Sequence, residues 1–188
     1  MSDKALFDAI RKVKGSALTQ SDVDLINAAL RGQAGPSVPQ AAIDLMHQFE
    51  SFQPNAYRDP GSKNGLPITI GWGSTSDLNG NPIRLGDVWT RAQADAKFAK
   101  DLEVFSRGVL EALKGAPTTD SQFGAMVSLA YNIGLKAFSA STLLKKHKAG
   151  DYAGAKAEFA RWRFNDGKEM AGLVRRRAAE AELYGRKG

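Results

Sequence analysis

Apolar residues recur at helical spacing from residue 39 to residue 52. On a helical wheel, Ala42, Leu45, Met46 and Phe49 fall in one continuous apolar arc. Pro54 then stands where a helix can no longer continue. The pattern predicts an amphipathic helix that begins near residue 39 and packs one face against a core.

The helical pattern gives way between residues 55 and 89. Gly, Pro and Asn surround short β-prone runs in this stretch, which predicts a small antiparallel sheet with tight turns. Capping boxes at "TRAQ" and "TDSQ" then predict helices that end around Lys114 and Ile133, with Gly134 as a cap. Two shorter helices follow in residues 139–150 and 151–162, separated by Gly150, and a last helix covers residues 172–184. The fold class is therefore α+β, a small sheet lobe followed by a helical lobe.

The first 35 residues have a different character. Two short amphipathic helices are expected in residues 1–31, and the Gly- and Pro-containing stretch "RGQAGPSVP" has no periodic apolar face. We interpret residues 1–35 as an N-terminal helical extension and residues 36–188 as the main domain. The acidic side chains of the extension argue against a simple basic arm, and it receives no functional assignment.

Composition excludes several classes of protein. The chain has 188 residues, 43% hydrophobic and 24% charged, as expected for a globular protein. It contains no cysteine and two isolated histidines, so we expect no metal site and no other cofactor. No apolar run reaches the roughly 20 residues of a membrane span, and the N-terminus lacks the pattern of a secretory signal. We therefore expect no stable membrane insertion.

The net charge of +6 favours a polyanionic partner. Nucleic acid, an acidic membrane surface and an anionic cell envelope all fit, and charge alone favours nucleic acid. The interleaved glutamates of "LVRRRAAEAELY" do not suit a nucleic-acid helix. In that segment we interpret Arg176 and Glu180 as an ordinary i,i+4 pair that supports a helix.

Glu50 lies at the edge of the apolar arc, near the end of the first predicted helix. It could be a solvated residue that pairs with an arginine, or a carboxyl group kept partly dry. Partial burial disfavours the charged form of a carboxyl group, as a general acid near neutral pH requires. Asp59 in a Pro-Gly turn and Thr69 before a Gly-rich stretch follow it. Two carboxyl groups in unlike environments can divide acid and base roles.

Three segments together resemble a known family. The stretch "FESFQPNAYRDPGSKNGLPITIGWGS" is similar to the Glu, Asp and Thr signature of the phage-type lysozymes, glycoside hydrolase family 24. The segments "QFGAMVSLAYNIGLKAFSASTLLKKHKAGD" and "ARWRFNDGKEMAGLVRRRAAEAELY" resemble the helical lobe and closing helix of that family. The likeness covers residues 39–184. It implies a lysozyme-like fold and an endolysin that hydrolyses the β-1,4 bond between N-acetylmuramic acid and N-acetylglucosamine in peptidoglycan.

The resemblance also implies roles for the three residues. Glu50 would protonate the glycosidic oxygen, Asp59 would orient or deprotonate water, and Thr69 would hold that water. Inversion needs carboxyl groups about 6.5–9.5 Å apart and retention about 5–5.5 Å, and the resemblance favours inversion. Because "GSKNGLP" lengthens the segment before Thr69, Thr75 is an alternative hydroxyl.

The same likeness gives candidates for binding the sugar. Gly71 and Gly73 would allow strand geometry and close approach of the sugar, and Tyr131, Asn132 and Ser141 would line the cleft from the helical lobe. For Ser141, a helix-capping role is an equal alternative. Outside the site we expect Phe138 and Trp162 in the core, and His47 and His147 in solvent.

Two other functions remain open. A lytic transglycosylase would cut the same bond without water, and a non-catalytic peptidoglycan-binding protein would bind without cutting. The resemblance makes peptidoglycan, and not nucleic acid, the expected polyanionic partner. It further implies a monomer that collects in the host cytoplasm, depends on a holin for release, and acts on the cell wall in the periplasm.

Overall fold

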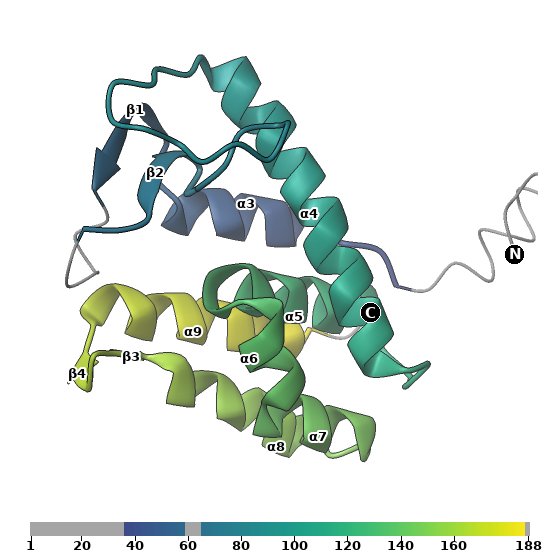
Figure 1. The fold of residues 1–188 in the computed structure, drawn as a ribbon. Coiled ribbons are helices and arrows are strands. Elements are labelled where there is room, and N and C mark those ends of the chain that lie inside the picture. Colours follow the sequence, from purple (N-terminus) through teal and green to yellow (C-terminus); the bar gives the residue numbers. More distant parts are fainter. Residues whose placement is uncertain (1–35, 59–64, 187–188) are drawn as a thin grey trace, which may run out of the picture. The chain divides into compact units, whose positions relative to one another are not determined.

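A computed structural model describes residues 36–58 and 65–186, all within a compact unit that spans Pro36–Gly188. The predicted N-terminal extension of residues 1–35 lies outside the described residues, as does Asp59. Two lobes make up the described part, and both are visible in Figure 1. The small lobe holds the two longer strands, and the larger lobe is helical.

The small lobe begins with the predicted amphipathic helix. Helix α3 (Gln40–Phe49) buries Ala42, Leu45 and Met46. Strands β1 (Gln53–Arg58) and β2 (Ile68–Gly71) pair antiparallel, with Tyr57 opposite Thr69, and a bulge interrupts the register. A small core of Met46, Trp72, Ala94 and Phe98 holds this lobe together.

Helix α4 (Arg91–Leu113) runs from the small lobe down one side of the helical lobe (Figure 1). It begins with a complete capping box: the Thr90 hydroxyl accepts from the Gln93 amide, and the Gln93 side chain accepts from the Thr90 amide. Such caps satisfy backbone groups that the first turn leaves unpaired. The predicted start and the predicted end near Lys114 are confirmed.

Helix α5 (Asp120–Ile133) forms the centre of the helical lobe, and every residue from Phe123 to Ala130 is buried. Around it lie α6 (Leu135–Ala140), α7 (Thr142–Lys148), α8 (Tyr152–Glu158), the 3-10 turn η1 (Phe159–Trp162) and α9 (Ala171–Tyr184). Phe138 is fully buried, as predicted. Burial of such a side chain stabilises the fold by about 1.5–3 kcal/mol.

The predicted fold class, α+β with a small antiparallel sheet and a helical lobe, is confirmed. The structure adds two elements that the sequence did not predict. They are the short helix α6 and a hairpin of β3 (Phe164–Asn165) and β4 (Lys168–Glu169). Each is too short to produce a recognisable apolar period. Among the residues described, no helix is both long and apolar enough to cross a membrane.

Candidate active site

Glu50 occupies the point where α3 ends and the chain turns toward β1. Its backbone caps the helix, because its amide donates to the Met46 carbonyl oxygen at 2.8 Å. Its side chain is 19% exposed and therefore half-buried rather than solvated. Both interpretations left open by the sequence hold in part: the carboxyl group lies in a partly dry place, and it pairs with an arginine.

The partner of that carboxyl group comes from the far end of the chain. Arg176 on α9 donates from Nη1 to Glu50 Oε1 at 2.5 Å, and its side chain is 4% exposed. Arg176 and Glu180 do form the predicted i,i+4 pair, 3.2 Å apart, but both side chains are buried, so the pair is more than ordinary helix support. A sequence signal for their burial exists, since Arg176, Glu180, Leu183 and Tyr184 follow one i, i+4, i+7, i+8 stripe on α9 and all are buried.

Glu50 and Arg176 belong to a larger set of buried polar side chains that we call the charged cluster, made of Glu50, Ser128, Arg176, Arg177 and Glu180. Glu180 Oε1 accepts from Ser128 Oγ at 2.7 Å and from Arg177 Nη2 at 3.0 Å. Burial lowers the pKa of Arg177 to about 10, and the Glu180 carboxylate opposes that shift. Two carboxyl and two guanidinium groups thus meet where α9 crosses α3 and α5.

The two glycines after Thr69 do different things. A Cβ on Gly73, where φ is +90°, would lie 3.2 Å from Glu50 Oε2, so glycine leaves room for the carboxyl group. A Cβ on Gly71, where φ is +66°, would lie 2.9 Å from the Ala94 Cβ, inside the packing between β2 and α4. Gly73 therefore lies at the acid, and Gly71 lets β2 approach the long helix.

The hydroxyl groups expected to hold water lie in and after β2. Thr69 is buried, and its Oγ1 donates to the Pro67 carbonyl oxygen at 3.4 Å, while Thr75 is exposed in the loop that follows. Asp59 lies outside the described residues. The choice between Thr69 and Thr75, and the role of Asp59, stay predictions.

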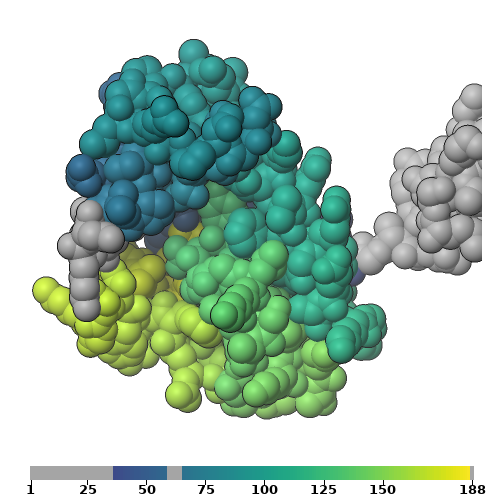
Figure 2. Space-filling model, viewed as in Figure 1, coloured from purple at the N-terminus to yellow at the C-terminus, as the bar shows by residue number. Residues whose placement is uncertain are grey.

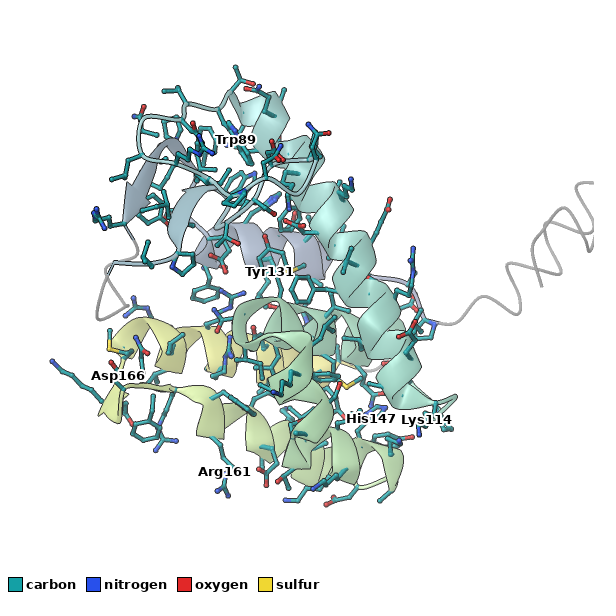
Figure 3. The ribbon with its side chains drawn as sticks, in the orientation of Figure 1. Trp89, Lys114, Tyr131, His147, Arg161 and Asp166 are labelled. Carbon is teal, nitrogen blue, oxygen red and sulfur yellow. The ribbon has the colours of Figure 1, made fainter. Side chains whose placement is uncertain are left out.

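Tyr131 joins the two lobes. From α5 its hydroxyl donates to the Trp72 carbonyl oxygen at 3.2 Å, and Figure 3 shows it between the small lobe and the helical lobe. Burial raises the pKa of Tyr131, and the negative charge of Glu50 adds to that effect. The hydroxyl therefore stays neutral and serves as a donor beside the acid.

Of the two remaining candidates, the structure places one beside Glu50. Asn132 lines the same cavity as Glu50, and its Oδ1 accepts from Arg177 Nη2 at 3.1 Å. Ser141 is buried, and its hydroxyl caps α7 by accepting from the Leu144 amide at 3.1 Å. Capping is thus the contact that the structure gives to Ser141, and its role in sugar binding stays a prediction.

A cavity of about 540 Å³ opens beside Glu50. In Figure 2 the molecule is hollowed between the small lobe and the yellow-green segments of the helical lobe. Trp162, Phe164 and Met170 line the cavity together with residues of α3, α5 and α9. Trp162 also packs against the main core, so its prediction as a core residue is right only in part. Phe164, 50% exposed, belongs to the hairpin that the sequence did not reveal.

Size does not single out this cavity. Hollows of about 580 Å³ and about 640 Å³ lie elsewhere on the helical lobe, beside Tyr184 and between α8 and α9. Glu50 lines neither of them. The cavity at Glu50 is distinguished by its chemistry, a half-buried carboxyl group facing apolar side chains and amides, the usual composition of a ligand site.

Both histidines were expected in solvent, and the structure contradicts this. His147 is 1% exposed, with Nδ1 2.5 Å from the Tyr184 hydroxyl and Nε2 2.8 Å from Thr118 Oγ1. We call Thr118, His147 and Tyr184 the histidine cluster, and Figure 3 places His147 low in the helical lobe. His47 is half-buried and stacks on Trp72 with ring centroids 4.3 Å apart. Two hydroxyl partners replace water at the His147 ring, and an indole ring covers one face of His47.

Within residues 36–58 and 65–186, no group of three or more His, Cys, Asp or Glu side chains could hold a metal ion. The charged cluster pairs its carboxyl groups with arginines, which leaves protein cations where a metal would otherwise bind.

Comparison with known proteins relates this arrangement to a family. The phage lysozyme family model matches residues 47–180. An endolysin of Bacillus phage PZA is 41% identical over 148 residues, which cover 78% of this chain and 54% of the relative. The chain thus spans about half the length of that relative. An endolysin of Acyrthosiphon pisum secondary endosymbiont phage 1 is 36% identical over 151 residues, covering 78% of this chain and 97% of the relative.

Solved structures agree with the sequence comparisons. An endolysin from Escherichia coli O157:H7 phage FAHEc1 superposes with a TM-score of 0.70 at 33% identity, over 81% of this chain and 95% of the other. The lysozyme-like arrangement of a small sheet lobe and a helical lobe is therefore shared.

Proposed function

The chain belongs to the phage lysozyme family, as the sequence predicted, and we propose that it is an endolysin that hydrolyses the β-1,4 bond between N-acetylmuramic acid and N-acetylglucosamine in bacterial peptidoglycan. The observation that carries the proposal is the position of Glu50. Its half-buried carboxyl group lies against a cavity of about 540 Å³, between the end of α3 and the buried Arg176.

Glu50 is the general acid. In its protonated form it donates to the glycosidic oxygen as the bond to the leaving sugar breaks. The donation leaves a carboxylate, and Arg176 already lies 2.5 Å from Oε1 to stabilise that negative charge.

Asp59 and Thr69 act on the water. Asp59 orients or deprotonates it, and the Thr69 hydroxyl, in β2, holds it. Attack from the face opposite the leaving group inverts the anomeric carbon, which requires the two carboxyl groups to stand about 6.5–9.5 Å apart. Proton NMR of the first products reports the anomer formed, and an immediate excess of the α-anomer is the expected result.

Sugar recognition uses the walls of the cavity. Asn132 presents an amide suited to acetamido and hydroxyl groups, and Trp162 presents an apolar ring for a sugar face. Gly73 leaves space beside Glu50 for the reacting unit. Gly71, Tyr131 and Ser141 are included as further sugar-binding residues on the strength of the family resemblance, and none of the three lines this cavity.

The experiment compares wild type with Glu50→Gln on purified cell walls, by loss of turbidity and by new reducing ends. Wild type should release reducing ends, and the variant should not. Glu158→Gln is the matched control, because Glu158 is also a buried, ion-paired glutamate, held by Lys146 at 2.8 Å. Equal rates for wild type and Glu50→Gln would refute the proposal.

The positive charge assists the encounter with an anionic cell envelope. Exposed charges are screened beyond about 10 Å at 0.1 M salt, so lysis should slow as salt is added. We further propose that the protein acts as a monomer and reaches the periplasmic face of the wall from the host cytoplasm through a separate holin. Lysis of expressing cells only after the membrane is permeabilised would support that route, and gel filtration reports the oligomeric state.

A further inference from the structure

Glu180 on α9 has no exposed side-chain surface, yet it carries an ionisable group. Its Oε1 accepts from Ser128 at 2.7 Å, from Arg177 Nη2 at 3.0 Å and from Arg176 Nε at 3.2 Å, and its Oε2 lies 2.9 Å from Arg177 Nε. Burial raises the pKa of the Glu180 carboxyl group, and the two guanidinium groups oppose that shift. The Glu180 carboxyl group is thus surrounded by donors from two guanidinium groups and one hydroxyl group. These contacts fit its ionised form.

Arg176 connects this buried carboxylate to the proposed acid. Its guanidinium group donates from Nε to Glu180 and from Nη1 to Glu50, while Nη2 lies 3.5 Å from the Ser128 carbonyl oxygen. The guanidinium group is planar, so fixing one edge on Glu180 fixes the direction of the opposite edge. The position of the Glu50 carboxyl group therefore depends on a residue that does not touch the cavity.

The charges of the cluster balance. Glu50 and Glu180 face Arg176 and Arg177, so the four groups sum to zero when all are ionised. Next to the cluster, Tyr131 on α5 stays neutral, and Lys97 and Asp101 on α4 form an ion pair with each other. Neither adds net charge. Loss of the Glu180 charge would leave two buried cations facing one carboxyl group.

We propose that Glu180 is a positioning residue for Glu50, acting through Arg176: it fixes the guanidinium group that holds the Glu50 carboxyl group, and it balances the charge of that guanidinium group. The proposal rests on the proposed role of Glu50 as the acid. A merely structural Glu180 would support α9 without influencing the pH dependence of lysis.

The test is the pH dependence of lysis by Glu180→Gln, expressed at each pH as a ratio to wild type so that changes in the wall cancel. Without the Glu180 charge, the two guanidinium groups favour the ionised form of Glu50. The alkaline side of the curve of lysis rate against pH should therefore move to lower pH by about one unit. The ratio of the variant rate to the wild-type rate should therefore be about ten-fold lower on the alkaline side of the pH range than on the acid side. Ser128→Ala, which removes one donor to Glu180, should give a smaller shift in the same direction.

Glu158→Gln is the matched control, because it removes a buried, ion-paired glutamate outside the charged cluster. It should lower the melting temperature with a constant ratio across pH. If Glu180→Gln does not fold, Ser128→Ala carries the test alone. Suppose that wild type is active and Glu50→Gln is inactive, but the rate of each folded cluster variant is a constant fraction of the wild-type rate at every pH. That result would overturn the role of Glu180 and leave the proposed function standing. Undiminished lysis by Glu50→Gln would instead overturn the proposed function.

Discussion

The charged cluster and the histidine cluster both tie α9 to other elements through buried polar side chains, but they differ in charge. The histidine cluster joins Thr118, His147 and Tyr184 by hydrogen bonds between neutral groups. The charged cluster brings two carboxyl and two guanidinium groups out of water. Both lie near cavities of similar size, about 580 Å³ and about 540 Å³.

The difference between the two clusters indicates the function of the buried charges. Buried ion pairs often contribute little net stability, because desolvation offsets their attraction, whereas the desolvation cost of neutral hydrogen-bonding groups is smaller. Between α7 and α9, the hydrogen bond of His147 with Tyr184 joins two neutral groups. Where α9 faces Glu50 it uses charges instead, which is explained if the charges serve a proton transfer and not the packing.

Replacing Glu50 should give the largest effect. Glu50→Gln removes the proton donor, and general acid catalysis contributes about 100- to 10,000-fold to a rate, so lysis should fall by at least about 100-fold. The glutamine is nearly the same size and its amide oxygen can still accept from Arg176, so the variant should fold, with a melting temperature lowered by the lost charge. His147→Gln, the comparison from the other cluster, should lyse walls at the wild-type rate at pH 8. If both variants lost activity alike, the division between the clusters would be wrong.

Removing the central cation of the charged cluster should affect stability next most. Arg176→Met leaves Glu50 and Glu180 without the cation between them, and breaking a buried ion pair costs about 3–5 kcal/mol. Chemical denaturation measures the loss. Arg175→Met is the control, since Arg175 is the exposed neighbour on the same helix and should change stability by less than about 0.5 kcal/mol. Similar losses in the two variants would contradict the role of Arg176.

The histidine cluster should make the stability of the fold depend on pH. Burial lowers the pKa of His147 below its ordinary value of 6.5, so the unfolded chain binds a proton that the folded protein does not. Stability is then fully present above pH 6.5 and is lost as the pH falls through and below that value. His147→Gln should cost about 1–3 kcal/mol at pH 8 and weaken this acid dependence.

His47 also contributes to that acid dependence, because burial lowers its pKa as well. Denaturation curves at pH 8 and pH 5 for wild type and His147→Gln separate the two contributions. An unchanged difference between the two pH values in the variant would show that His147 does not titrate as its burial requires.

Trimming the hairpin at the cavity should have the smallest effect. Phe164 is 50% exposed and lines the cavity at Glu50, so Phe164→Ala removes contact area for the substrate without touching the charged cluster. A loss of about 0.5–1 kcal/mol in binding corresponds to about a two- to five-fold rise in the substrate concentration for half-maximal rate. Val104→Ala, an equally exposed apolar residue on α4, is the control and should leave that concentration unchanged.

The sequence predicted the elements whose signals are local. The Thr90 and Thr119 capping boxes place the starts of α4 and α5, and Gly134 and Gly150 separate the helices that follow. The fold class followed from their order. The hairpin of residues 164–169 was not predicted, because strands of two residues are too short to show an alternating pattern.

The charged cluster was missed for a different reason. Arg176 and Glu180 stand four residues apart, a spacing typical of exposed helix pairs, and Glu50 lies 126 positions away from Arg176. Only the coincidence of Arg176 and Glu180 with Leu183 and Tyr184 on one stripe indicated their burial. The surroundings of His147 likewise depend on Thr118 and Tyr184, which no local pattern connects to it.

The central claim, that Glu50 acts as the acid of a peptidoglycan hydrolase, is tested most directly by mass spectrometry of the muropeptides released by wild type and Glu50→Gln. Wild type should release fragments that end in reducing N-acetylmuramic acid, one water heavier than the anhydro form, and Glu50→Gln should release almost none. Anhydro ends from wild type would identify a lytic transglycosylase. The same reducing fragments from Glu50→Gln, at the wild-type rate, would contradict the assignment of Glu50.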